Sequence, residues 1–365
     1  MKWKEQLLTL TPYQPGKSID EVKRQYGLEK IVKLASNENP FGCSGKVAEA
    51  FKNAPVSFAI YPDGYATDLR ESLAAFYKVA PDQLILGNGS DNLIQIISRA
   101  ILGSGVNTVM AVPTFSQYKH NAIIEGAEIR EVPLANGHHD LEGMLSKIDA
   151  NTGVVWVCNP DNPTGTYIPK DTLYAFLEKV PRDVLVVLDE AYIEYVVADE
   201  AYHVNELVSQ FENVIVLRTF SKIYGLASLR VGYGIAASEI IRALEPAREP
   251  FNVNTFAQKA ATLALEDQEF IQICKQKNRE GLEQFYQFCR ESNLDYYPSQ
   301  TNFILIDFKT DGNKVFQFLL ENGYIVRSGK PLGFPTSVRV TVGSKEQNEG
   351  VIEAMKQFLT LKTQS

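Results

Sequence analysis

Short hydrophobic runs alternate with amphipathic stretches through the first two-thirds of the chain. The run Val184–Leu188 is apolar at every position, which is typical of a strand buried on both faces of a sheet. Stretches such as 91–102 and 170–180 have the helical spacing of apolar residues. Strands alternating with helices predict an α/β fold with a mostly parallel sheet covered by helices on both faces. The predicted strands of this sheet are 84–86, 108–112, 129–132, 154–158, 184–188 and 214–217.

The pattern changes after about residue 254, where we predict a smaller α+β unit. A long helical stretch at 255–292 has a break near Glu266-Asp267. We expect an N-terminal arm at 1–35 that packs with the small unit, a large domain at 36–254 and a small domain at 255–365. The elements predicted after the long helical stretch are strands at 303–308, 324–326 and 338–342, and helices at 312–322 and 346–361.

Composition and charge restrict the class of protein. The chain has 365 residues, of which 45% are hydrophobic and 22% charged, as in ordinary globular proteins. A formal net charge of −8 without a basic patch argues against a nucleic-acid partner. The apolar runs are strand-sized and no signal peptide is recognised, so we expect no membrane segment and a cytoplasmic location.

Cysteines and histidines give no sign of a metal site. The cysteines show no metal-ligand spacing and are expected to be reduced thiols. His138 and His139 follow Gly137 in a polar stretch. We expect a solvated loop there, and metal binding is the less favoured alternative. The four cysteines are Cys43, Cys158, Cys274 and Cys289.

The run 219–233, T-F-S-K-I-Y-G-L-A-S-L-R-V-G-Y, is the most informative motif. Thr219 and Ser221 place hydroxyls beside Lys222, and Arg230 adds a second cation. Hydroxyls and cations on a loop after a buried strand favour a phosphate, and a lysine there can form a Schiff base with a carbonyl. Pyridoxal phosphate supplies both phosphate and aldehyde. The alternative is a surface loop that happens to contain Ser-Lys.

This run resembles the lysine segment of the fold-type I pyridoxal-phosphate enzymes of the aspartate aminotransferase group. The resemblance implies a large domain with a mostly parallel seven-stranded sheet, a smaller α+β domain, and Lys222 as the catalytic residue. A pyridoxal phosphate site also needs a carboxylate for the ring nitrogen, a donor near the ring hydroxyl, a stacking surface and a phosphate cradle.

Two motifs at strand ends supply candidates for the ring. Asp189 closes a buried strand, where a carboxylate needs a cation such as a protonated pyridine nitrogen, although an ion pair or helix cap would also explain it. Tyr192 follows and can donate to the ring hydroxyl oxygen. The string N-P-D-N-P-T-G at 159–165 resembles the asparagine loop of the same group, with Asn162 beside the ring hydroxyl, whereas alone it would be read as a turn.

Two further motifs supply candidates for the phosphate and the stacking surface. In G-N-G-S-D-N at 87–92, backbone N–H groups of Gly89, Ser90 and Asp91 at a helix N-terminus can bind a phosphate. The dinucleotide-binding fingerprint is set aside because Asn92 occupies the place of its third glycine. Phe115 is placed to stack on the ring, with a core aromatic as the alternative, and Tyr118 is a weaker candidate stacker.

The resemblance also implies substrate-facing and partner-facing residues. Arg339 lies inside an apolar strand, where an arginine needs an anion, and it resembles the arginine that binds the substrate carboxylate. Arg327 is a second candidate, and a surface arginine is the alternative for it. Asn37, in S-N-E-N-P-F-G, would line the substrate side, and Tyr13 could donate to a substrate phosphate. Tyr61, in Y-P-D-G, resembles the tyrosine that reaches the partner's cofactor phosphate, which implies a homodimer with shared active sites.

Within the group, S-N-E-N-P-F-G, Y-P-D-G, N-G-S-D and F-S-K-x-x-G-L-A-x-x-R together resemble the histidinol-phosphate aminotransferase family. This resemblance implies ping-pong amino transfer between histidinol phosphate and 2-oxoglutarate, giving imidazole acetol phosphate and glutamate, in histidine biosynthesis. Aromatic amino-acid aminotransferases and threonine-phosphate decarboxylases share most of these strings and stay as alternatives. A cofactor-sensing transcription regulator would need a DNA-binding module, for which the chain before Ser36 is too short.

Overall fold

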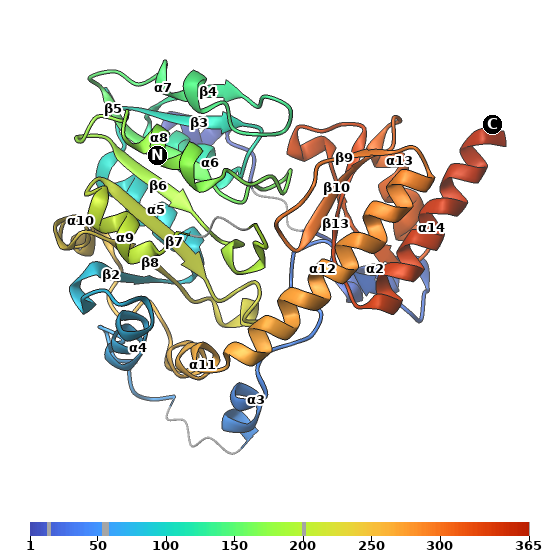
Figure 1. The fold of residues 1–365 in the computed structure, drawn as a ribbon, viewed down its shortest axis with the longest axis horizontal. Helices are drawn as coiled ribbons and strands as arrows, with labels where there is room; N and C mark the ends of the chain where they lie inside the picture. Colours follow the sequence, from blue (N-terminus) through green and yellow to red (C-terminus); the bar gives the residue numbers. More distant parts are fainter. Residues whose placement is uncertain (13–15, 53–57, 199–201, 365) are drawn as a thin grey trace.

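Two packed units form the molecule, and the long helix α12 (Gln268–Glu291) runs between them (Figure 1). The computed structural model describes residues 1–12, 16–52, 58–198 and 202–364. The larger unit is built on a seven-stranded sheet and the smaller on a four-stranded sheet. This arrangement confirms the predicted fold class.

The large sheet has the strand order β2-β8-β7-β6-β5-β3-β4. All neighbouring pairs are parallel except those of β8, which runs antiparallel to β2 and β7. The six predicted strands are confirmed, and β8 was not predicted. In chain order, the strands are β2 (Leu84–Gly87), β3 (Asn107–Val112), β4 (Glu128–Pro133), β5 (Thr152–Cys158), β6 (Leu185–Asp189), β7 (Val214–Thr219) and β8 (Gly232–Ala236).

Helices cover both faces of the large sheet, as the apolar strands predict. In β6, Val186 and Leu188 pack into one hydrophobic cluster, while Leu185 and Val187 pack into another on the opposite face. The cluster around Val187 contains apolar residues of the helices α5 (Gly89–Ile101), α6 (Gln117–Glu125) and α10 (Ser238–Leu244). The cluster around Val186 contains apolar residues of the helices α3 (Gly45–Lys52), α4 (Thr67–Tyr77), α7 (Leu141–Leu145), α8 (Lys170–Leu177), α9 (Val204–Gln210) and α11 (Thr255–Leu265).

The smaller unit packs α12, α13 (Gly312–Glu321) and α14 (Lys345–Gln364) around its sheet. The antiparallel strand order is β12-β13-β10-β9. The predicted helix break is confirmed, because α11 ends at Leu265 and Asp267 caps α12 by accepting from the Phe270 N–H. The strands are β9 (Asp295–Tyr296), β10 (Phe303–Asp307), β12 (Arg327–Ser328) and β13 (Ser337–Thr341).

The N-terminal region contacts both units. Helix α1 (Glu5–Thr9) lies against α6 through Lys4, whose Nζ donates to the Ile124 carbonyl at 3.0 Å. Helix α2 (Ile19–Tyr26) packs with the small unit, and β1 (Val32–Lys33) pairs with β11 (Tyr324–Ile325) outside the four-stranded sheet. Within the described residues, no helix is long and apolar enough to cross a membrane. Short 3-10 helices are η1 (Pro81–Gln83), η2 (Ile193–Tyr195), η3 (Ala227–Leu229), η4 (Glu245–Ala247) and η5 (Lys330–Leu332).

Candidate active site

One edge of the large sheet collects the polar motifs. The strands β2, β3, β5, β6 and β7 all end there because they run in the same direction, and ligands bind at this edge in open α/β sheets. Strand β8 runs the opposite way and begins there, two residues after Arg230. The predicted residues on or directly after these strand ends are Gly89, Ser90, Asp91, Phe115, Asn162, Asp189, Tyr192, Thr219, Ser221 and Lys222.

Lys222 points its amine into the protein. Its Nζ donates to the Ser36 carbonyl at 3.3 Å and lies 5.5 Å from the centre of the Tyr192 ring. Burial, reinforced by the positive charge of Arg339, lowers the pKa of this amine from 10.5 to about 8. A substantial fraction of the amine is therefore neutral near pH 8, as a nucleophile or a proton acceptor requires.

Asp189 is a buried carboxylate that has no cationic partner among the described residues. The Tyr118 hydroxyl donates to it at 2.7 Å, and the Ala191 N–H donates at 3.2 Å. Burial raises the pKa of Asp189 to about 6, against the opposing effect of the Tyr118 hydrogen bond. No ion pair within the described parts of the chain involves this carboxylate. A cationic group of a ligand would therefore stabilise its charged form.

Tyr118 has a role that the sequence did not reveal. Its ring stacks on Trp156, with ring centres 4.9 Å apart, and Phe115 meets it edge-on at 5.6 Å. The Tyr118 hydroxyl donates to Asp189, and its ring packs on Trp156, so the residue supports Asp189 and does not offer an open stacking surface. The only available signal was that a fully buried tyrosine needs a hydrogen-bond partner.

Asn162 and Tyr192 are each oriented by a neighbour. The Arg339 guanidinium donates to the Asn162 side-chain oxygen, which leaves the amide N–H groups of Asn162 as donors toward a ligand. Asn37 donates to the Tyr192 hydroxyl oxygen at 2.9 Å, so the hydroxyl hydrogen is directed elsewhere. Burial raises the pKa of Tyr192, which keeps that hydrogen in place at neutral pH. In turn, Thr341 donates to the Asn37 side chain at 3.0 Å.

The phosphate-binding candidates meet at the N-terminus of α5. Gly89 has a φ of 74°, and a Cβ atom there would lie 2.8 Å from a guanidinium nitrogen of Arg230. Arg230 donates to the Ser221 hydroxyl at 3.2 Å and pairs with Asp91 at 3.5 Å. Thr219 accepts from the Ser221 N–H at 3.1 Å, which fixes the turn before Lys222. Backbone N–H groups of a helix N-terminus beside an arginine suit an anion.

Two arginines of the small unit lie side by side. Arg327 and Arg339 are directly opposite each other in the β12–β13 pair, so their side chains leave the same face of the sheet. Arg339 is buried, donates to the Ala35 carbonyl at 3.0 Å, and lies 5.0 Å from the centre of the Phe303 ring. A guanidinium group suits a carboxylate or a phosphate, so both arginines are candidate anion ligands.

One predicted site residue, Tyr61, lies apart from this cluster. Tyr61 is 77% exposed and stacks on Phe251, with ring centres 4.7 Å apart, so it contributes nothing to its own chain's cluster. Tyr13 lies outside the described residues.

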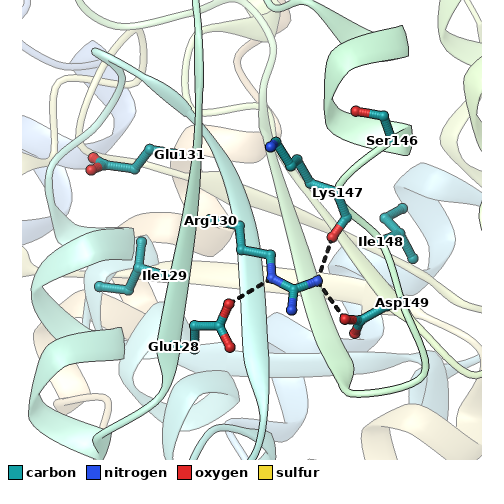
Figure 2. A pocket seen from close by; sticks show the side chains of 8 residues that line it. All are labelled: Glu128, Ile129, Arg130, Glu131, Ser146, Lys147, Ile148 and Asp149. Carbon is teal, nitrogen blue, oxygen red and sulfur yellow. Dashed lines mark hydrogen bonds and ion pairs between the residues drawn. The ribbon is translucent and has the colours of Figure 1, made fainter.

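A surface hollow on edge strand β4 is separate from the site (Figure 2). Arg130 in this hollow donates to Glu128 at 2.8 Å and pairs with Asp149 at 2.7 Å. No predicted site residue lines the hollow. Charged side chains on an edge strand disfavour pairing with other strands, which accounts for these residues structurally.

The histidine prediction is wrong for His139. His138 is exposed, whereas His139 is 7% exposed and its ring contacts the Asp161 carboxylate at 3.1 Å. The polar composition around it concealed a buried hydrogen-bond network. The four cysteines are free thiols, and the described residues contain no group of side chains suited to a metal ion.

The donor and acceptor groups at the sheet edge fit pyridoxal phosphate. Asp189 has no cation beside it in the described parts of the chain and suits a pyridinium nitrogen. Asn162 and Tyr192 offer donors to a ring hydroxyl, and Lys222 offers a partly neutral amine. The α5 N-terminus with Arg230 suits the phosphate.

The chain matches known aminotransferases over nearly its whole length. Residues 29–355 match the family model of aminotransferase class I and II. The chain is 62% identical over 359 residues to a histidinol-phosphate aminotransferase of Geobacillus sp. (strain WCH70), covering 98% of each chain. A second relative, from Geobacillus thermodenitrificans, is 61% identical over 98% of each chain.

The fold agrees with a solved structure of the same kind. The histidinol-phosphate aminotransferase of Sinorhizobium meliloti, solved in complex with pyridoxal-5′-phosphate, superposes with a TM-score of 0.90 at 26% identity and covers 98% of each chain. The protein therefore belongs to the class I and II aminotransferases and, within them, to the histidinol-phosphate aminotransferase family.

Proposed function

We propose that the chain transfers an amino group between L-histidinol phosphate and 2-oxoglutarate, giving imidazole acetol phosphate and glutamate. The observation that carries this proposal is the inward-pointing amine of Lys222 over the Tyr192 ring, near the Arg339 guanidinium that orients Asn162. Bound pyridoxal phosphate supplies an aldehyde for the amino group and a ring that withdraws electrons from the substrate's Cα.

Residues from several strands would hold the cofactor. Asp189 would pair with the ring nitrogen, and Asn162 and Tyr192 would donate to the ring hydroxyl oxygen. Phe115 would pack on the ring face, edge-on to Tyr118. The phosphate would be bound by Gly89, Ser90, Asp91, Thr219, Ser221 and Arg230, together with the partner subunit's Tyr61.

Lys222 would act as the nucleophile for the cofactor and then as the proton carrier. Once displaced by the substrate amine, its own amine would take the proton from the substrate's Cα. A neutral amine is required for this step, and the lowered pKa supplies it near pH 8. Donor and acceptor would use one site in turn, so ping-pong kinetics are expected.

The paired arginines would let one pocket accept two different substrates. Glutamate brings an α-carboxylate and a side-chain carboxylate, whereas histidinol phosphate brings a phosphate and no carboxylate. Arg339 and Arg327 can bind either anion, because a guanidinium matches carboxylate and phosphate geometry. Asn37 would line the substrate side beside Tyr192. Tyr13 would add a hydroxyl donor to the substrate phosphate.

A homodimer with shared sites would explain the exposed aromatic patch around Tyr61. Large apolar side chains are exposed here, and such patches mark interaction sites. Burying them against a second copy would also bring Tyr61 to the partner's cofactor. The patch comprises Phe58, Ile60, Tyr61, Tyr65 and Phe251, which are 45–87% exposed.

The cysteines bear on the location of the protein. Four free cysteines favour the reducing cytoplasm.

The domain borders expected from the sequence, an arm at 1–35 and a border after residue 254, stay predictions. Packing favours a later border inside α12, because Ile271 and Cys274 belong to the large unit's cluster and Leu282 to the small unit's.

A comparison of amino donors tests the substrate. We expect kcat/KM for histidinol phosphate to exceed that for phenylalanine and tyrosine, each with 2-oxoglutarate, with weak aromatic transamination as a side activity. Arg327→Ala should lower kcat/KM for histidinol phosphate about 10- to 100-fold, because a charge-assisted hydrogen bond is lost. The same substitution should lower kcat/KM for phenylalanine less.

Arg182→Ala is the matched control, because this arginine is exposed and remote from the site. A tenfold or larger preference for phenylalanine would instead favour an aromatic amino-acid aminotransferase.

A further inference from the structure

Asp161 is a fully buried carboxylate next to Asn162. It is 1% exposed, and burying a charge is costly unless hydrogen bonds compensate. The Thr114 hydroxyl donates to it at 2.6 Å and the Thr164 hydroxyl at 2.8 Å. His139 contacts it at 3.1 Å.

Thr164 belongs to the same loop as Asp161, whereas Thr114 and His139 come from two other segments. Thr114 precedes Phe115 in the loop after β3, and Asp161 precedes Asn162 in the loop after β5. Asp161 therefore ties together the two loops that carry the proposed stacking ring and the proposed amide donor. His139 reaches the same carboxylate from the segment between β4 and α7.

The histidine ring is oriented by this contact. A carboxylate only accepts hydrogen bonds, so the Nε2 atom of His139 carries the proton that faces Asp161. The other ring nitrogen, Nδ1, is buried without a hydrogen-bond partner among the described residues. The contact with Asp161 is therefore the side-chain hydrogen bond that orients the ring within the described structure.

We propose that His139, with Thr114, is a positioning residue that acts through Asp161 to fix the spacing between Phe115 and Asn162. Neither residue would touch the substrate. Their effect would be to hold the two loops so that ring and hydroxyl contacts of the cofactor form together. This inference rests on the proposed cofactor site.

The test compares His139→Ala, His139→Gln and Thr114→Val with wild type and with His138→Ala, the exposed neighbour. Three quantities are measured: the Kd of pyridoxal phosphate for the apoprotein by equilibrium dialysis, kcat and KM for both substrates, and the Tm of the apoprotein. Since small misplacements of reacting groups are costly, we expect His139→Ala and Thr114→Val each to raise the Kd about tenfold and lower kcat about tenfold. KM should change less than kcat.

His139→Gln should recover most of both losses, because a glutamine amide can also donate to Asp161. His138→Ala should match wild type. A cofactor Kd and kcat unchanged in Thr114→Val and His139→Ala, whatever their Tm, would overturn the proposal. If His139→Ala does not fold, Thr114→Val, which keeps the side-chain shape, decides alone. Failure of the proposed function would look different, because wild type itself would then lack turnover.

Discussion

At the scale of single residues, the lowered pKa of the Lys222 amine arises mainly from desolvation. Burial is the largest cause of its lowered pKa, with the charges of Arg339 and Arg230 acting in the same direction. The negative charges of Asp91 and Glu38 oppose the shift only in part. The residue that makes the amine more neutral, Arg339, also orients Asn162, so one side chain prepares two of the proposed functional groups.

The pH dependence of cofactor capture tests this account. An amine attacks an aldehyde only when it is neutral, and it is neutral above its pKa. We expect the rate at which apoprotein gains the visible absorption band of lysine-bound pyridoxal phosphate to rise with pH and to be half-maximal near pH 8. Lys222→Ala should show neither the band nor turnover. A half-point near 10.5, the ordinary lysine value, would contradict the desolvation argument.

At the scale of elements, the N-terminus of α5 depends on a glycine with a left-handed backbone. Gly89 has a positive φ, which is unfavourable for other residues, and its α-carbon faces Arg230. The backbone of Gly89 also approaches β8, because a Cβ atom on Gly232 would lie 2.8 Å from the Gly89 carbonyl carbon. Helix, strand and arginine are therefore close-packed around the proposed phosphate site.

Gly89→Ala should weaken cofactor binding by displacing Arg230. The added methyl group would collide with the guanidinium, and the positive φ adds strain of about 1 kcal/mol or more. We expect the Kd of pyridoxal phosphate to rise at least about tenfold, with inorganic phosphate losing its ability to compete. Gly103→Ala is the matched control, because nothing lies within 4 Å of its Cβ position. Equal cofactor affinity in the two variants would argue against a phosphate at α5.

Elements with strong patterns could be predicted from sequence, and those that depend on remote contacts could not. Strand β8 was missed because Gly232 and Gly234 give it a weak strand signal. Glycine fits there because the backbone of the α5 N-terminus comes close, which no local pattern reveals. Most residues of the candidate site were predicted from the strand ends, since parallel strands end at one edge. The contacts of Tyr118 with Asp189, and of His139 with Asp161, join distant segments and needed the fold.

At the scale of the whole molecule, the exposed aromatic patch sets an expectation about assembly. Tyr61 stacks on Phe251 at the surface, and the two residues remain 77% and 45% exposed. Aromatic side chains are enriched at protein interfaces. If a second copy covers them, each active site combines Lys222 of one subunit with the partner subunit's Tyr61.

Complementation between two defective variants tests this shared site. Lys222→Ala is expected to be inactive, and Tyr61→Ala strongly impaired through weaker cofactor binding. After subunit exchange, each hybrid dimer should contain one site with both lesions and one with neither. With half of the dimers hybrid, and one complete site of two in each, activity should rise to about a quarter of wild type. Mixing the Lys222→Ala/Tyr61→Ala double variant with wild type is the control, because such hybrids contain no complete site. Hybrids confirmed by mass that bring no rise in activity would place Tyr61 outside its partner's site.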